Sequence, residues 1–104
     1  MIVDLRTYTL KPGKAGEFLK LFEAEGLALQ TKHCGRLVGY FTTETGTLNQ
    51  VVQMWAYEDS ADRDARRASL WADPEWLAFG QKVLHLFQHQ ENRLLKPTSF
   101  SPLR

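Results

Sequence analysis

Several polar and aromatic residues of this chain could stabilise a negative charge on a bound molecule. Arg6 and Tyr8 stand two positions apart near the start, and Gln53 and Trp55 have the same spacing in the middle. Guanidinium, phenol, amide and indole groups donate hydrogen bonds, which a developing enolate or oxyanion needs. The candidate ligand-pocket residues of this kind are Arg6, Tyr8, Asn49, Gln53, Trp55, Trp76 and His89.

Each candidate also has a structural interpretation. Asn49 lies where a turn favours asparagine, Trp55 could anchor a dimer interface, and Arg6 could pair with Glu91 or Asp4. The segment "LWADPEW" (70–76) places two tryptophans around a helix break. They could fill the space between helix and sheet, or the break could open a cavity that one indole lines. Both alternatives stay open for every candidate.

Length and composition exclude several classes of protein. A chain of 104 residues fits a single domain, residues 1–104, with one core. The formal net charge is +1, and the charges are spread along the chain, so we expect no nucleic-acid partner. No apolar run is long enough to span a membrane, and the single cysteine suits a reducing compartment. We therefore expect a cytoplasmic protein without a membrane partner.

No metal or cofactor site is predicted. His33, His85 and His89 lack metal-ligand spacing, and no glycine-rich phosphate loop or serine nucleophile motif is present. Cys34 follows His33 directly, an arrangement that does not present the thiol to the imidazole, so we do not expect a nucleophilic cysteine.

Changes of hydrophobic period divide the chain into strands and helices. A period of two predicts strands at 2–10, 36–44, 50–58 and 86–97, and a three-to-four period predicts a helix from 14 that Gly35 ends. A second helical region follows from 59 or 60, with a break at 72–74 because Asp73 and Pro74 start a new helix. The order β-α-β-β-α-β predicts an α+β, ferredoxin-like fold, in which a four-stranded antiparallel sheet carries its helices on one face.

Alternation along the strands predicts which side chains lie beneath the helices. We expect the wholly apolar set there, namely Val3, Leu5, Val52, Met54 and Ala56. The opposite face would then carry Asp4, Arg6, Tyr8, Val51, Gln53, Trp55 and Tyr57. Such a face is too apolar to stay in water, and a second copy of the chain is the simplest cover. The dimer-interface candidates are Tyr40, Val51 and Tyr57.

Four ordered segments resemble the NIPSNAP family over essentially the whole chain. They are "LRTYTLKPGK" (5–14), "LVGYFTTETGTLNQVVQMWAYED" (37–59), "SADRDARRASLWADPEW" (60–76) and "QENRLLKPTSFSP" (90–102). The resemblance implies a ferredoxin-like domain that pairs through its sheets into a dimeric α/β barrel. The wider superfamily includes cofactor-independent monooxygenases, isomerases, dehalogenases and haem-handling enzymes. The resemblance implies that one histidine of this chain could bind haem iron, as in some of these relatives. Their chemistry takes place between sheet and helices.

Two functions remain open. The first is a homodimer that binds or transforms a small hydrophobic molecule in a cavity between sheet and helices, with monooxygenase-like chemistry as one option. The second is a non-enzymatic dimeric interaction module whose sheet face is used up by its partner. A cavity of a few hundred Å³ that holds buried polar groups would favour the first.

Overall fold

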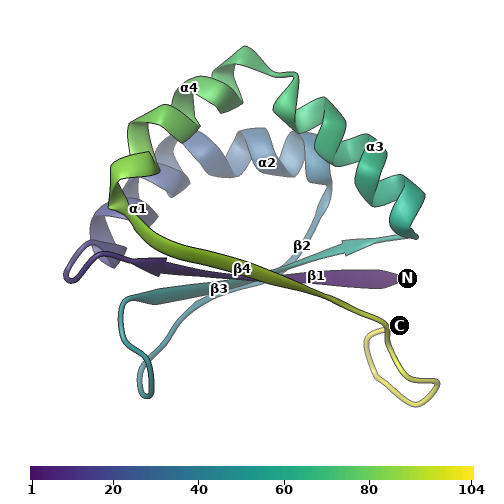
Figure 1. The fold of residues 1–104 in the computed structure, drawn as a ribbon. Helices are drawn as coiled ribbons and strands as arrows, with labels where there is room; N and C mark the ends of the chain where they lie inside the picture. Colours follow the sequence, from purple (N-terminus) through teal and green to yellow (C-terminus); the bar gives the residue numbers. More distant parts are fainter.

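Four strands form one sheet, and the helices arch over one of its faces, in a computed structural model that describes residues 1–104 (Figure 1). The strand order is β2-β3-β1-β4, and all neighbours are antiparallel. The predicted ferredoxin-like α+β fold is confirmed. The elements are β1 Ile2–Leu10, α1 Ala15–Leu21, η1 Phe22–Gly26, α2 Leu27–Cys34, β2 Arg36–Thr42, β3 Gln50–Tyr57, α3 Ser60–Trp71, α4 Pro74–Val83, η2 Leu84–Leu86 and β4 Phe87–Leu95.

Aspartates start both helices of the second helical region. The Asp59 carboxylate accepts a hydrogen bond from the Asp62 amide at 2.8 Å at the start of α3. The Asp73 carboxylate accepts one from the Glu75 amide at 2.9 Å, with Pro74 in the first turn of α4. Side-chain acceptors at this position satisfy backbone donors that have no partner within the helix. The predicted break between the two helices is therefore confirmed.

The first helical region contains a π-turn, η1, between α1 and α2. Its buried positions recur every four residues, at Phe18, Phe22, Gly26, Gln30 and Cys34. In a regular α-helix with 3.6 residues per turn, each such step would rotate the buried stripe by about 40°. The wider π-turn absorbs part of this rotation. As a result Gln30 is buried, whereas its apolar neighbour Leu29 is only partly buried.

The predicted orientation of the strands is wrong. Val51, Gln53, Trp55 and Tyr57 of β3 are at most 3 % exposed and lie beneath the helices. Antiparallel pairing sets Tyr8, Arg6, Asp4 and Ile2 opposite these residues, so they share the helix face. Large aromatic side chains fill the space under the helical arch, and their polar groups find hydrogen-bond partners there. The smaller apolar residues Val52, Met54 and Ala56 occupy the opposite face.

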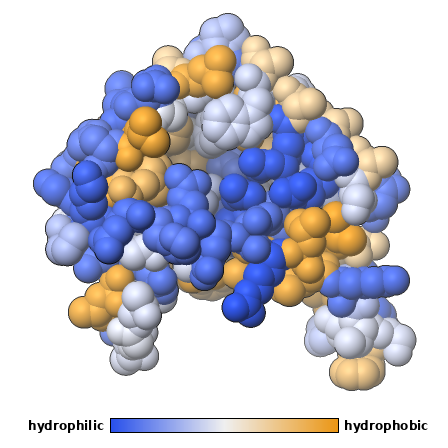
Figure 2. Space-filling view, viewed as in Figure 1, coloured by the Kyte–Doolittle hydropathy of each residue, from blue (hydrophilic) through white to orange (hydrophobic).

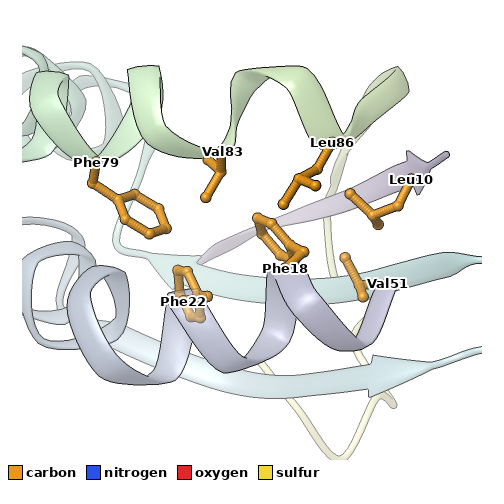
Figure 3. Close-up of a cluster of buried hydrophobic side chains, with 7 residues drawn as sticks. All are labelled: Leu10, Phe18, Phe22, Val51, Phe79, Val83 and Leu86. Atoms are coloured by element: carbon orange, nitrogen blue, oxygen red, sulfur yellow. The ribbon is translucent and has the colours of Figure 1, made fainter. Parts of the chain in front are cut away.

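The hydrophobic core beneath the helices has two parts. The larger cluster joins α1, η1, α4 and the adjoining strand ends, through Leu10, Phe18, Phe22, Val51, Phe79, Val83 and Leu86 (Figure 3). The smaller cluster joins the other halves of the helices and sheet, through Cys34, Trp55, Tyr57 and Leu70. Trp76 packs against both clusters. The polar residues Asp4 and Gln53 are buried on the same face of the sheet, without any exposed surface.

The sheet face away from the helices carries an uncovered apolar patch. Pairing places Leu5 opposite Met54, and Phe41 opposite Val52, on this face. Phe41 is 52 % exposed and Leu95, at the end of β4, is 39 % exposed. The β2–β3 loop and the C-terminal tail extend on this side of the sheet (Figure 1).

None of the helices is long and apolar enough to cross a membrane.

Replacing Gly26 by alanine should destabilise the protein, because the added methyl group would lie 2.8 Å from the rings of Phe22 and Phe79. We expect a loss of about 1–3 kcal/mol in the free energy of unfolding, measured by urea denaturation. Gly16→Ala is the matched control, since no atom lies within 4 Å of its added methyl group. It should leave stability unchanged or raise it by up to about 1 kcal/mol. Equal effects of the two substitutions would contradict this packing.

Candidate functional site

A cavity of about 200 Å³ lies between α4 and the strands β1 and β4. Ten of its sixteen lining residues are hydrophobic. Figure 2 shows the recess below the helical arch, apolar in its depth and bordered by hydrophilic side chains. The aromatic residues of its wall are Tyr8, Phe18, Phe22, Trp71, Trp76, Phe79 and Phe87, and the charged and amide residues are Arg6, Gln30, Arg67, Gln81 and Gln90.

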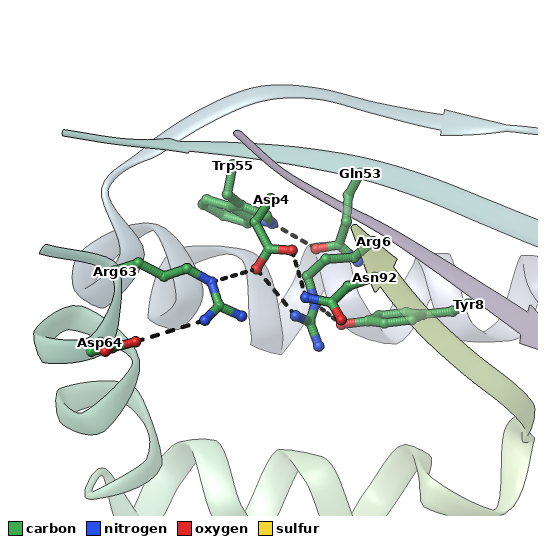
Figure 4. A network of polar contacts seen from close by, with 8 residues as sticks. All are labelled: Asp4, Arg6, Tyr8, Gln53, Trp55, Arg63, Asp64 and Asn92. Carbon is green, nitrogen blue, oxygen red and sulfur yellow. Dashed lines mark hydrogen bonds and ion pairs between the residues drawn. The ribbon is translucent and has the colours of Figure 1, made fainter. Parts of the chain in front are cut away.

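A buried carboxylate beside the cavity organises the polar wall (Figure 4). Asp4 has no exposed surface, and it accepts hydrogen bonds from Arg6 at 3.2 Å, Arg63 at 3.1 Å and Asn92 at 3.0 Å. The Nε of Arg6 donates to the Tyr8 hydroxyl at 3.1 Å. One carboxylate therefore joins β1, β4 and α3. Charge-assisted bonds of this kind satisfy a group that would be costly to bury alone.

The surroundings of this cluster keep the side chains of Asp4 and Arg6 charged. Burial alone would raise the pKa of Asp4, but the Asn92 hydrogen bond and the charges of Arg6 and Arg63 hold it below its ordinary value. Burial alone would lower the pKa of Arg6, but Tyr8 and Asp4 more than compensate, so it is raised. The wall of the cavity thus carries a permanent positive charge.

A second hydrogen-bonded chain lies on the sheet next to Arg6. The Trp55 indole donates to the Gln53 carbonyl at 2.6 Å, and the Gln53 amide donates to the Tyr40 hydroxyl at 3.2 Å. Tyr40 in turn stacks on Phe22, with ring centroids 5.0 Å apart. Burial raises the pKa of Tyr40, so its hydroxyl stays protonated. This series of hydrogen bonds joins Trp55, Gln53 and Tyr40 on the sheet beneath the helices, but none of the three residues lines the cavity.

The structure brings together only part of the predicted site. Arg6, Tyr8 and Trp76 line the cavity, whereas Gln53 and Trp55 are buried beneath the helices. Asn49 has a φ of 60° and accepts a hydrogen bond from the Gly13 amide at 3.1 Å, so its role is in the turn. His89 lies away from the cavity on β4, 3.8 Å from Glu91.

The predicted interface residues also lie on the helix side. Val51 and Tyr57 are core residues, and Tyr40 packs against the larger cluster. The assignment of Val51 and Tyr57 to the sheet face away from the helices is wrong, because both contribute to the core beneath the arch. Trp55 is fully buried and is likewise not an exposed anchor. Arg6 pairs with Asp4, as one of the two structural alternatives proposed.

Among the cavity residues that were missed from the sequence, Gln30 and Arg67 are the two polar ones that are not exposed. Gln30 is 2 % exposed, and its side chain forms no hydrogen bond with the protein. Every fully enclosed side-chain polar atom of the structure has a hydrogen-bond partner, so the Gln30 amide is not fully enclosed. It is accessible from the cavity that the residue lines. Arg67 lies one helical turn after Arg63 and forms no salt bridge within the chain. The four-residue spacing of Phe18, Phe22, Gly26 and Gln30 was the only signal for Gln30. Nothing in the sequence distinguished Arg67 from its arginine neighbours.

Other reactive groups are occupied elsewhere. Cys34 is 1 % exposed, and burial raises the pKa of its thiol, which disfavours a thiolate. His33 lies 2.8 Å from the Ser69 hydroxyl through Nδ1 and 2.8 Å from the Asp73 carboxylate through Nε2. This cluster joins α2 to α3 and to the start of α4, and none of its members lines the cavity.

The cavity wall is suited to binding an anion more than to moving protons. Its lining residues include no carboxylate, imidazole or thiol, and Tyr8 is the only phenol. A general base must lie within hydrogen-bond reach of the proton that it removes. Arg6 can stabilise negative charge on a bound molecule, and the aromatic rings can bind its apolar part. No three histidine, cysteine or acidic side chains are grouped as metal ligands.

Asp4→Asn should destabilise the protein by about 3 kcal/mol or more at pH 7, because Arg6 and Arg63 lose their buried counter-charge. The folded-state pKa of Asp4 lies below its ordinary value of 3.8, so its contribution is complete above that value and is lost as the pH falls through the folded pKa. The difference between wild type and variant should therefore shrink in acid, measured by urea denaturation at pH 7 and pH 3.

Asp64→Asn is the control for this prediction. The Asp64 side chain is 78 % exposed and lies 3.8 Å from Arg63. We expect a change within about 0.5 kcal/mol at both pH values. A loss for Asp4→Asn that does not depend on pH would show that the Asp4 charge is not what stabilises the fold.

Comparison with known protein sequences identifies relatives along the whole chain. The NIPSNAP family profile matches residues 3–102. Protein NipSnap homolog 3A of Homo sapiens is 35 % identical over 103 residues, which are 99 % of this chain and 42 % of the relative. A NipSnap homolog 2 of Danio rerio is 32 % identical over 99 % of this chain and 35 % of its own length. The chain thus spans less than half of these relatives.

Solved structures show the same family and, at greater distance, the same fold. A NIPSNAP family protein with unknown function from Agrobacterium tumefaciens has a TM-score of 0.97 and 46 % identity, over 100 % of this chain and 94 % of the other. An antibiotic biosynthesis monooxygenase has a TM-score of 0.64 and 14 % identity, over 94 % of this chain and 99 % of the other, a likeness of fold alone. By sequence and structure, the chain belongs to the NIPSNAP family.

Proposed function

We propose that this protein binds a small hydrophobic molecule in the cavity beneath its helices and acts as a homodimer. The observation that carries the proposal is the cavity itself, about 200 Å³ with a largely hydrophobic wall and the charged Arg6 at its edge. Small-molecule sites commonly combine an apolar wall with a few placed polar groups. The similarity in fold to an antibiotic biosynthesis monooxygenase is consistent with such a use of the cavity.

Binding is the activity that the lining residues support best. Stabilising an enolate or phenolate at Arg6 is the chemistry that they can add, and this would be needed in a cofactor-independent oxidation. A reaction of that kind would draw its proton acceptor from the bound molecule or from water, since the wall has no strong base.

We place this activity in the cytoplasm, which fractionation of cells that express the protein would check.

Dimerisation through the open sheet face is the second part of the proposal. Leu5, Val52, Met54 and Phe41 form an apolar surface on that face, and soluble monomers seldom leave such surfaces uncovered. The cavity lies on the opposite side of the sheet, so a partner there would leave it free. A non-enzymatic interaction module would use the same sheet face without any ligand.

Filling the cavity tests the binding part. Gly80 lines the cavity, and no atom lies within 4 Å of a Cβ built there, so Gly80→Leu can place a side chain in the space. We expect the variant to fold with at least wild-type stability, because leucine favours a helix more than glycine by up to about 1 kcal/mol. It should lose at least about tenfold in affinity for 2-naphthalenemethanol, measured by titration calorimetry.

Gly16→Leu is the matched control for the cavity, because Gly16 is also helical, has open space around it and lies outside the cavity wall. It should bind 2-naphthalenemethanol as the wild type does. Undiminished binding by Gly80→Leu, or no binding by the wild type, would contradict the proposed site.

A charge in the apolar patch tests the dimer. Met54→Lys should convert a dimer into monomers, measured by size-exclusion chromatography with light scattering, since a desolvated unpaired ammonium is costly in an interface. Ala65→Lys on the exposed side of α3 is the control and should remain dimeric. A wild-type monomer at micromolar concentration, or a dimer that Met54→Lys leaves intact, would refute an interface on this face.

A further inference from the structure

We propose that the cavity selects an organic anion, a small carboxylic acid with an aromatic or similarly flat apolar body. This inference rests on the proposed binding function and adds the chemical class of the ligand. It follows from three features of the wall: an excess of positive charge, a buried residue whose amide has no protein partner, and charged groups that lie on other elements than most of the aromatic groups.

The charges around the cavity do not balance. Arg6 and Arg67 line it, and no aspartate or glutamate does. Asp4 is the only fully buried carboxylate nearby, and it is shared between Arg6 and Arg63. Arg67 has no acidic partner in the chain. An anion that entered the cavity would therefore meet a net positive field in a partly desolvated site, where electrostatic attraction is stronger than in water.

Donors remain free on this wall. Arg6 uses Nε for Tyr8 and Nη1 for Asp4, and its other terminal nitrogen, Nη2, forms no side-chain hydrogen bond or salt bridge within the protein. In Figure 4 one terminal nitrogen of Arg6 points toward the helices without a dashed line. Gln30, buried by the π-turn, adds an amide without a protein partner. A buried polar group of this kind is costly unless water or a ligand bonds to it.

The charged residues of the wall lie apart in the sequence from most of its aromatic residues. Arg6, Gln30 and Arg67 belong to β1, α2 and α3, whereas most of the aromatic and aliphatic residues come from α1, η1, α4 and β4, which add only the neutral amides Gln81 and Gln90. A ligand with a charged end and a flat apolar body matches this division. The carboxylate would take the arginine and amide donors, and the rings of Trp76 and Phe79 would contact the body.

The volume limits the size of that body. An engineered dry cavity of about 150 Å³ in another protein binds benzene. A cavity of about 200 Å³ is thus suited to one ring or two fused rings, and it is smaller than the pockets of about 300–1,000 Å³ that hold drug-sized molecules. The naphthalene skeleton is accordingly a suitable probe.

The test compares three probes that share the naphthalene skeleton and carry a negative, a neutral or a positive substituent: 2-naphthoate, 2-naphthalenemethanol and 2-naphthylmethylammonium. Titration calorimetry at pH 7 with the wild type should give at least about tenfold tighter binding for the carboxylate than for the alcohol, with the ammonium weakest. Arg67→Gln should reduce the preference for the carboxylate to less than about threefold while the alcohol binds as before.

Arg66→Gln is the matched control. Arg66 is the adjacent residue of α3, but it pairs with Asp62 at 2.9 Å and does not line the cavity. It should keep the full preference for the carboxylate. Gln30→Leu, which removes an amide without a protein partner, should fold normally and weaken 2-naphthoate by about fivefold.

The outcomes separate this inference from the function on which it rests. Equal affinity for the alcohol and the carboxylate, or a preference that Arg67→Gln leaves unchanged, would overturn the anion inference while leaving the cavity as a binding site. Failure of all three probes to bind would overturn both. A carboxylate preference that disappears in Arg67→Gln and persists in Arg66→Gln would support both.

Discussion

The fold beneath the helices depends on one buried carboxylate. Asp4 has no exposed surface and accepts bonds from Arg6, Arg63 and Asn92, which belong to β1, α3 and β4. An unpaired carboxylate at this position would be costly, whereas three donors satisfy it and connect a helix to two strands. The same contacts keep the Arg6 guanidinium charged on the wall of the cavity. Stability and the proposed recognition thus share one group of residues.

The cavity exists because α4 lies over β1 and β4, and the aromatic core does not completely fill the space between the helix and these strands. α3 and α4 meet at a break around Asp73, and α4 carries Gly80 where a larger side chain would enter the space. Trp71 and Trp76 pack edge to face beside that break, with centroids 6.4 Å apart, and both line the cavity. Trp76 fits both interpretations, because it packs against both core clusters and also lines the cavity, whereas Trp71 is 53 % exposed. The π-turn then brings Gln30 to the wall of the cavity that Arg6 and Arg67 also line.

Most of the architecture was predictable from local patterns. The periods of the strands, Gly35 after the first helix, and Asp73 with Pro74 each have a local physical cause, and each was placed correctly. The orientation of the strands was not predictable in the same way, because both sides of β3 are apolar enough to be buried. The preference for the smaller residues beneath the helices was wrong: hydrogen bonding allowed Gln53 and Trp55 to be buried.

The candidate site was also predictable only in part. Arg6, Tyr8 and Trp76 were found from their chemistry, but Gln30 depends on a π-turn and Arg67 on how α3 crosses the sheet. Neither is encoded in a short motif. In the structure Arg6, Tyr8 and the large aromatic side chains of the sheet face the helices, which is the reverse of the predicted orientation. The cavity and the proposed dimer face therefore lie on opposite sides of the sheet, and one chain can support both.

A crystal structure of the protein with 2-naphthoate would test the central claim most directly. We predict the rings beneath α4 against Trp76 and Phe79, and a carboxylate oxygen within about 3.2 Å of a donor of Arg6 or Arg67, the ordinary limit for such a bond. The salt bridge between Arg6 and Asp4 should persist in that complex. A ligand bound only outside the cavity, or one whose carboxylate points away from both arginines, would contradict the account.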